Sequence, residues 1–326
     1  MKKIFITLFA VICALTSVKA ANPYDNPDTL FVSRDGTGQF RTIGEAVEVC
    51  RAFMEYHKVI YVKNGVYKEK LTIPSWLTNI EICGESKENT IITYDDHANI
   101  RLPLTNQPMG TFRTYTVKVE GSDITFKNIT IENNAAKLGQ AVALHTEGDR
   151  LVFVNCRLLG NQDTIYTGVG DTRLYFKDCY VEGTTDFIFG PSTAWFENCT
   201  IHSKQNSYVT AASTPQSTPY GYVFNHCKLT AADGVTKVYL GRPWRPYAYT
   251  LFMNCELGAH IVPAGWHNWG NASNEHTARY LEYGNTGAGA KAGERAQWSR
   301  QLTKKDAAEV TLENVFKMDT AWLPEL

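Results

Sequence analysis

The sequence lacks the short motifs that mark several common enzyme classes. It contains no G-x-S-x-G nucleophile turn, no H-E-x-x-H zinc helix and no G-x-x-x-x-G-K phosphate loop, and its cysteines form no C-x-x-C pair. The run GTGQFR (36–41) lacks the third glycine of a dinucleotide-binding loop, so it is typical of a turn. The adjacent acids Asp95 and Asp96 also fit a turn better than a calcium site.

The chain also lacks an excess of positive charge and a long apolar run after its N-terminus. A basic pair, an apolar stretch from Ile4 to Leu15 and a small residue at Ala20 are typical of a secretory signal peptide cut after Ala20, and the stretch is too short to span a membrane. Without residues 1–20 the net charge falls from -1 to about -4, because three lysines and no acid are removed. This predicts a secreted or periplasmic protein that does not bind nucleic acid and has no membrane span. Residues 21–326 show no linker, and we expect one domain that is a monomer.

From residue 59 onward the sequence consists of short β-rich runs that repeat one phrase. An aromatic or apolar residue is followed by Asn, Asp or His, then by Cys or Ile, and then by a polar residue. Five cysteines mark successive copies of this phrase: Cys156, Cys179, Cys199, Cys227 and Cys255. A repeat of about 20 to 28 residues without intervening helices favours a stacked β-solenoid over a β-sandwich, whose turns come about every 8 to 12 residues. The cysteines would form a ladder inside the solenoid, and Cys179 and Cys199, on adjacent coils, are close enough in this arrangement for a disulfide.

Two helices are expected at the ends of the solenoid. Thr42 and Glu45 form a capping box, and apolar residues at helical spacing predict an amphipathic helix over about 43–56 that covers the first coil. Thr303 and Asp306 begin a second predicted helix, over 303–316, that would pack near the far end.

The repeat also brings two acids into register. Asp163 and Asp186 each follow a cysteine of the phrase by seven residues, so in a solenoid they lie one coil apart, about 4.8 Å. Two carboxyls this close cannot both ionise cheaply, which predicts a protonated acid beside a carboxylate nucleophile. Gln162 and Gln140, which lies one repeat before Asp163, would provide amide donors for an oxyanion. Two turn aspartates that cap their own backbone are the alternative interpretation.

The segment LGRPW (240–244) places Arg242 two residues before Trp244. An arginine can hold an ionised carboxylate, and an indole offers a flat face to a sugar ring. Trp266 and Trp269 add aromatic residues that are expected in an exposed loop.

These motifs together resemble the pectin methylesterases, carbohydrate esterases built on an all-β fold, the right-handed parallel β-helix. The matching segments cover nearly the whole mature chain in the order of that family: DGTGQFRTIGEAV (35–47), GVYKE (65–69), GQAVAL (139–144), GNQDTIY (160–166), DFIFG (186–190), LGRPW (240–244), PAGWHNW (263–269), YLEYGNTGAGA (280–290) and WLP (322–324).

The resemblance implies a role for each matching residue. Asp186 would be the nucleophile and Asp163 the general acid and base, while Gln140 and Gln162 would stabilise the oxyanion and Arg242 would hold Asp186. Five further residues match substrate-contacting positions, of which the first is the most secure: Trp244, Thr111, Trp266, Tyr166 and Phe189. The implied substrate is the methyl-esterified homogalacturonan of pectin, with no metal and no organic cofactor. Cys179 and Cys199 fall where plant members have a disulfide.

Two residues depart from the pattern of the family. His145 stands where many plant members have arginine, and Asn161 replaces an aromatic residue. Both are expected beside the cleft, so they affect the preferred substrate more than the chemistry. An esterase or thioesterase of the same fold that acts on another acyl group is the alternative function. A non-catalytic polysaccharide-binding solenoid would not need the acids, amides and arginine together.

Overall fold

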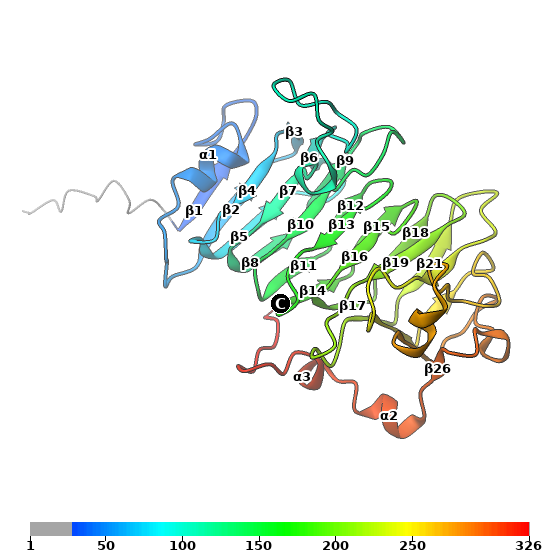
Figure 1. Cartoon of the computed structure of the whole chain (residues 1–326). Coiled ribbons are helices and arrows are strands. Elements are labelled where there is room, and N and C mark those ends of the chain that lie inside the picture. The colour runs from blue at the N-terminus through cyan, green and yellow to red at the C-terminus, as the bar shows by residue number, and fades with distance from the viewer. Residues whose placement is uncertain (1–27, 326) are drawn as a thin grey trace, which may run out of the picture.

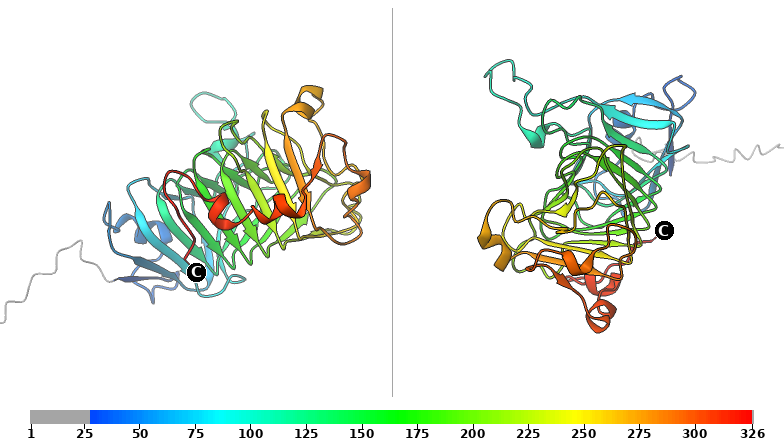
Figure 2. Two further views of the ribbon diagram at one scale, coloured as in Figure 1. Left: turned by 90° about the horizontal axis from the view of Figure 1, so that it is seen from below. Right: turned by 90° about the vertical axis from the view of Figure 1, so that its right-hand side faces the viewer.

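The polypeptide winds into a right-handed parallel β-helix, as the sequence predicts (Figure 1). The structure is a computed structural model and describes residues 28–325. Each full coil contributes one strand to each of three parallel sheets, which run along the length of the molecule (Figure 2). No helix within the described residues is long and apolar enough to cross a membrane.

The three sheets differ in length. The 11-stranded sheet contains β1 (Thr29–Val32), β2 (Lys58–Val62), β5 (Thr78–Gly84), β8 (Ser122–Lys127), β11 (Leu151–Val154), β14 (Arg173–Lys177), β17 (Thr193–Glu197), β20 (Tyr222–Asn225), β23 (Tyr249–Met253), β25 (Arg279–Tyr283) and β26 (Arg300–Gln301). The 8-stranded sheet contains β3 (Gly65–Lys68), β6 (Thr90–Tyr94), β9 (Thr130–Asn133), β12 (Arg157–Leu159), β15 (Tyr180–Gly183), β18 (Thr200–Ser203), β21 (Lys228–Ala231) and β24 (Glu256–Leu257). The 7-stranded sheet contains β4 (Leu71–Ile73), β7 (Val117–Val119), β10 (Leu144–Thr146), β13 (Ile165–Thr167), β16 (Ile188–Gly190), β19 (Tyr208–Ala212) and β22 (Tyr239–Gly241).

The repeated phrase of the sequence forms the bend between the 11-stranded and 8-stranded sheets. Its Asn, Asp or His residues all adopt a left-handed backbone conformation, with φ between 52° and 55°: Asn128, Asn155, Asp178, Asn198, His226 and Asn254. These residue types tolerate that conformation better than most, which explains why they recur at this place. The next residue in each coil, Ile129 or a cysteine, is then directed into the core, where all six are buried.

Aromatic stacking holds the coils in register. Six phenylalanines form a continuous interior column with ring centroids 4.3 to 5.4 Å apart: Phe126, Phe153, Phe176, Phe196, Phe224 and Phe252. The cysteine ladder lies beside this column, as predicted. The expected disulfide between Cys179 and Cys199 is absent: both are free thiols, and each donates to a carbonyl oxygen of the preceding coil, at 3.4 and 3.6 Å.

Both end helices begin where the sequence predicts but end earlier. Helix α1 spans Ile43–Glu48 with the predicted capping box, and the backbone after it bonds to the next coil instead: the Phe53 N–H donates to Trp76 O, in the turn before β5, and the side-chain amide of Asn79 donates to Met54 O. The predicted helix over 303–316 is two short helices, α2 (Lys304–Ala308) and α3 (Leu312–Val315).

The C-terminal segment, predicted to pack near the far end of the solenoid, begins there after β26 and packs with Leu281 of the last coils before it leaves that end. It runs back across the outer face of the 11-stranded sheet (Figures 1 and 2). There Val315 and Phe316 join a second apolar cluster with outward-facing residues of the strands, such as Tyr175 and Trp195. The buried guanidinium of Arg173 fastens the segment by donating to the carbonyl oxygens of Phe316 and Thr320. Three 3-10 helices complete the chain: η1 (Thr111–Arg113), η2 (Ala272–His276) and η3 (Ala292–Glu294).

Candidate active site

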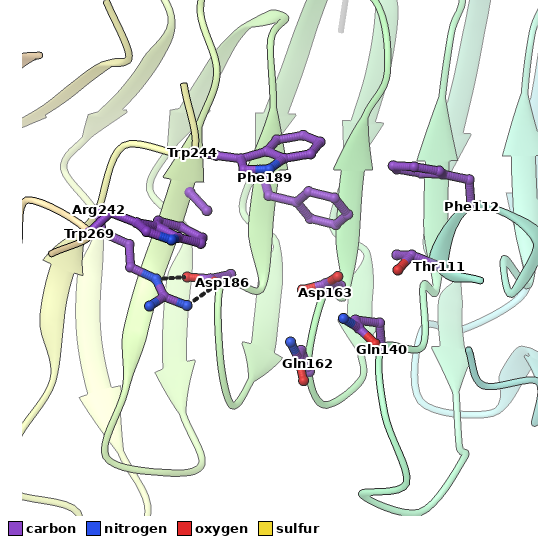
Figure 3. A pocket seen from close by; sticks show the side chains of 11 residues that line it. Thr111, Phe112, Gln140, Gln162, Asp163, Asp186, Phe189, Arg242, Trp244 and Trp269 are labelled. Carbon is purple, nitrogen blue, oxygen red and sulfur yellow. Dashed lines mark hydrogen bonds and ion pairs between the residues drawn. The ribbon is translucent and has the colours of Figure 1, made fainter. Parts of the chain in front are cut away.

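A pocket of about 230 Å³ lies on the 7-stranded sheet, in the middle of the solenoid. Its walls come from the turns before β10, β13 and β16, from the residues around β22, and from the 3-10 helix η1 (Figure 3). Eleven residues line it: Thr111, Phe112, Gln140, Gln162, Asp163, Asp186, Phe189, Ala211, Arg242, Trp244 and Trp269.

The two acids occupy equivalent positions on adjacent coils. Ile165 pairs with Ile188 in the parallel ladder, and Asp163 and Asp186 each lie two residues earlier. Both have a left-handed backbone, with φ of 68° and 49°, a conformation that Asp adopts more readily than most residues. The two carboxyls are directed into the same pocket (Figure 3). The structure thus brings the predicted pair together.

The two carboxyls have different partners. Asp186 accepts a two-pronged ion pair from Arg242, with Nε to Oδ1 at 3.0 Å and Nη2 to Oδ2 at 2.7 Å. Among the described residues, none donates a hydrogen bond to the carboxyl of Asp163. Only 8% of Asp163 and 6% of Asp186 is exposed.

These surroundings separate the two acids electrostatically. Burial, and then the charge of Asp186, raise the pKa of Asp163 well above its usual value. Burial also raises the pKa of Asp186, but the hydrogen bonds and charge of Arg242 oppose that effect. The pKa values of both carboxyls are therefore raised, that of Asp163 more strongly than that of Asp186. Of the two carboxyls, this arrangement favours the proton on Asp163 and the negative charge on Asp186.

Arg242 is itself held between two aromatic rings. Its guanidinium carbon lies 3.9 Å from the ring centre of Tyr208 and 3.7 Å from that of Trp269. Trp269 has a left-handed backbone with φ of 63°, and its N–H donates to Nδ1 of His267 at 3.0 Å. The planar stacking on both faces fixes the direction from which the guanidinium meets Asp186.

Gln140 and Gln162 lie beside Asp163 on one side of the pocket (Figure 3). The turns that carry them are joined by a hydrogen bond from the N–H of Ala141 to the carbonyl oxygen of Gln162, at 3.1 Å. The sequence spacing of Gln140 from Asp163 suggests that these two residues are in register, but they are not. Leu144 pairs with Ile165, which makes this coil shorter than the coil that separates the two acids. The residue in register with Asp163 is Val142, and Gln140 reaches the pocket from two residues earlier.

Aromatic rings form one wall of the pocket. Tyr166 contacts Phe112 and Phe189 at 4.8 and 4.7 Å between ring centres and approaches Trp244 at 6.4 Å. Phe112, Phe189 and Trp244 line the pocket, whereas Tyr166 supports them from the side. Thr111, the residue before Phe112, also lines the pocket.

The prediction that Trp266 is an exposed, substrate-contacting residue is wrong. Its side chain is 2% exposed and packs against Tyr280 at 4.3 Å inside the last coils, and its indole N–H donates to Glu282. Trp269, which is 37% exposed, lines the pocket instead.

Sequence reasoning gave no role to Phe112, Ala211 or Tyr208. Phe112 lies in a long irregular connection that carries no periodic pattern, so nothing in the sequence could locate it. Ala211 is in register with Phe189, so the repeat itself could have identified it.

Both departures from the family pattern lie close to the pocket without lining it. His145 is buried against Tyr166, with ring centres 4.8 Å apart, and burial lowers its pKa to about 4, although Glu147 at 3.0 Å opposes this. The amide of Asn161 donates to the carbonyl oxygen of Ala135 at 3.0 Å. Within residues 28–325, no group of three or more His, Cys, Asp or Glu side chains could hold a metal ion.

The chain is similar in sequence and in fold to proteins of one family. The sequence matches the family named Pectinesterase over residues 29–319. It is 38% identical to Pectinesterase 31 of Arabidopsis thaliana over 299 residues, which cover 90% of this chain and 94% of that protein. The structure is similar to the pectin methylesterase from carrot (TM-score 0.79, 32% identity, 86% of this chain and 89% of that one). It is also similar to a pectin methylesterase in complex with a hexasaccharide (TM-score 0.78, 30% identity, 91% and 98%).

Proposed function

The chain belongs to the pectinesterase family and is a carboxylic-ester hydrolase, and from this premise we propose that it hydrolyses the methyl esters of homogalacturonan. The products are methanol and a polymer with free carboxylates. The observation that carries this proposal is the pair Asp163 and Asp186 in one pocket, of which only Asp186 is bound by an arginine.

In the first half of the reaction, the carboxylate of Asp186 attacks the carbonyl carbon of the methyl ester. The negative charge that develops on the carbonyl oxygen is stabilised by the side-chain amides of Gln140 and Gln162. Asp163, protonated because burial and Asp186 raise its pKa, gives its proton to the departing methoxy oxygen. Methanol leaves, and the galacturonate acyl group stays on Asp186 as an anhydride.

In the second half, Asp163 is a carboxylate and removes a proton from a water molecule. That water attacks the acyl carbon, the bond to Asp186 breaks, and the galacturonic acid group that forms loses its remaining proton to solvent and is released as a carboxylate. Asp163 is protonated again and Asp186 returns to its ion pair with Arg242. No cofactor is needed, because both steps use only these two acids and water.

The polymer would lie across the aromatic wall. Trp244 offers an indole face to a sugar ring, and Phe189, with Tyr166 behind it, provides an apolar surface near the ester methyl group. Thr111 and Trp269 lie on the two sides of the acids (Figure 3) and would contact neighbouring sugars.

A pectin-processing enzyme must meet its substrate outside the cytoplasm. The expected signal peptide, cut after Ala20, agrees with a secreted or periplasmic location, although residues 1–20 lie outside the described part of the chain. We also expect the mature enzyme to act as a monomer.

Methanol release from methylated pectin tests this function. Asp186→Asn removes the nucleophile while keeping the shape of the side chain, and we expect a loss of at least about 10⁴-fold in kcat. The matched control is Asp171→Asn, an exposed aspartate between β13 and β14 that should leave the rate unchanged. Activity of the Asp186 variant near the normal level would refute the mechanism. Turnover of acyl thioesters with no turnover of pectin would favour the alternative substrate.

A further inference from the structure

A buried asparagine outside the pocket joins three segments that build it. Asn133, the last residue of β9, is only 2% exposed. Its side-chain nitrogen donates to three carbonyl oxygens: Asp96 at 3.0 Å, Thr114 at 3.0 Å and Val142 at 3.1 Å. Its side-chain oxygen accepts the N–H of Ala135 at 3.0 Å.

Two of these carbonyls belong to the ends of the long connection between β6 and β7. Asp96 lies at its start and Thr114 at its end, and between them the connection carries Thr111 and Phe112 into the pocket. Among the described residues, only Asn133 donates a hydrogen bond to both of these carbonyl oxygens. Asn133 therefore joins the two ends of this loop from inside the coil, while Lys70 also links them by donating to the Asp96 carboxylate and to the carbonyl oxygen of Arg113, both at 2.6 Å.

The other two contacts flank Gln140. Residues 134–139 form no helix or strand. Asn133 fixes the start of this segment by its bond to Ala135, and it fixes the backbone just after the segment by its bond to Val142. Val142 is in register with Asp163 on the next coil. The same amide therefore holds both the backbone beside Asp163 and the turn that carries Gln140. The loop is also joined directly to this turn, because the N–H of Ala98 donates to the carbonyl oxygen of Gln140 at 2.8 Å.

Asn161 provides a second tether for the same turn. Its amide donates to the carbonyl oxygen of Ala135, while Asn133 accepts from the N–H of that residue. Ala135 is thus held on both sides by side-chain amides. Asn161 belongs to the turn that carries Gln162, so the two amide residues of the proposed oxyanion site are connected through it.

We infer that Asn133 is a positioning residue for the esterase, which acts by fixing the turn of Gln140 against the acids, with Asn161 as a weaker partner. This inference rests on the proposed function, because it assigns Gln140 to the oxyanion. A displacement of about 1 Å in a group that contacts the reacting atoms can lower a rate by about 100-fold. The effect should appear in kcat, because an oxyanion contact forms fully only in the transition state.

A double-mutant cycle on methanol release distinguishes positioning from a general structural role. We expect Gln140→Ala to lower kcat by about 10²–10³-fold and Asn133→Ala to lower it by about 10–100-fold, with KM changed less than about threefold. In the Gln140→Ala background, Asn133→Ala should lower kcat by less than about threefold, because the group that it positions is already absent. Full loss in both backgrounds would overturn the inference, as would an unchanged kcat for folded Asn133→Ala.

The matched control is Asn225→Ala. Asn225 is also a buried asparagine at the end of a strand and uses both ends of its amide, but it lies on the 11-stranded sheet, bonded to Glu197 and Asn254. We expect it to lower the melting temperature and leave kcat unchanged. If Asn133→Ala does not fold, Asn161→Ala at its half-buried position decides the question, and an unchanged kcat for that variant overturns the inference. A wild-type enzyme with no methanol release would refute the proposed function instead.

Discussion

Replacing Arg242 by alanine should move the pH dependence of the enzyme toward alkaline pH. Asp186 must be ionised to attack the ester, so its pKa sets the acid limb of the activity profile. Arg242 bonds both oxygens of that buried carboxyl, at 3.0 and 2.7 Å, and lowers its pKa against the effect of burial. Without the guanidinium, the carboxylate loses the group that favours its charged form, and its pKa rises.

The size of the shift follows from the geometry of the pair. An opposite charge within about 4–6 Å lowers the pKa of a carboxyl by about 1–3, and each pKa unit corresponds to about 1.4 kcal/mol. We therefore expect the acid limb of kcat/KM to move upward by about 1–3 pH units. Arg242 also lowers the pKa of Asp163, but through charge alone and without a hydrogen bond. The alkaline limb should move in the same direction by a smaller amount.

Methanol release measured across the pH range checks this expectation. At a pH on the acid limb, Arg242→Ala should lose about 10–1,000-fold in kcat/KM, and part of the loss should be recovered at higher pH. Arg242→Lys keeps the charge but loses the two-pronged contact and the stacking between Tyr208 and Trp269. The acid limb of this variant should therefore lie between those of the wild type and of Arg242→Ala. Arg245→Ala is the control, because this exposed guanidinium lies over Trp244 and bonds to neither acid. An acid limb that stays in place in Arg242→Ala would refute the assigned roles of Asp186 and Arg242.

Two further predictions concern the second acid and the core. Asp163→Asn should lower kcat by about 10²–10⁴-fold, because the methoxy group then leaves without a proton donor, and a rate within a few-fold of wild type would remove Asp163 from the mechanism. Phe176→Ala, in the middle of the stacked column, should lower the free energy of unfolding by about 3–5 kcal/mol as measured by denaturant titration, and a loss below about 1 kcal/mol would show that the column does not stabilise the coils.

The sequence was sufficient to predict the coil and the pair of acids, because both follow from repetition. A bend residue of the type Asn, Asp or His before a buried cysteine marks five successive coils, and the ladder pairing confirms that Asp163 and Asp186 are in register. The location of Arg242 and Trp244 in the same pocket followed from the family resemblance and not from spacing.

The parts that sequence reasoning missed are those where the repeat breaks. Coil lengths vary, so the sequence separation of the two acids does not apply to Gln140, which lies on a shorter coil. The first helix is shorter than predicted because backbone groups after it, such as the N–H of Phe53, form hydrogen bonds with the neighbouring coil. Trp266 and Trp269 lie three residues apart in one loop, and only the three-dimensional path of that loop shows that one fills the core and the other faces the pocket.

The difference between the two acids has its origin in their neighbours along one column of the solenoid. The ladder pairing places Val142, Asp163, Asp186 and Tyr208 at equivalent positions of four successive coils. Asp163 therefore has an apolar neighbour on one side and a carboxylate on the other, which both disfavour its ionisation. Asp186 has Tyr208 on its far side, and that ring supports the guanidinium that keeps Asp186 ionised. Two identical side chains at equivalent positions of adjacent coils thus differ in their tendency to ionise, which suits them to the opposite roles that we propose for them.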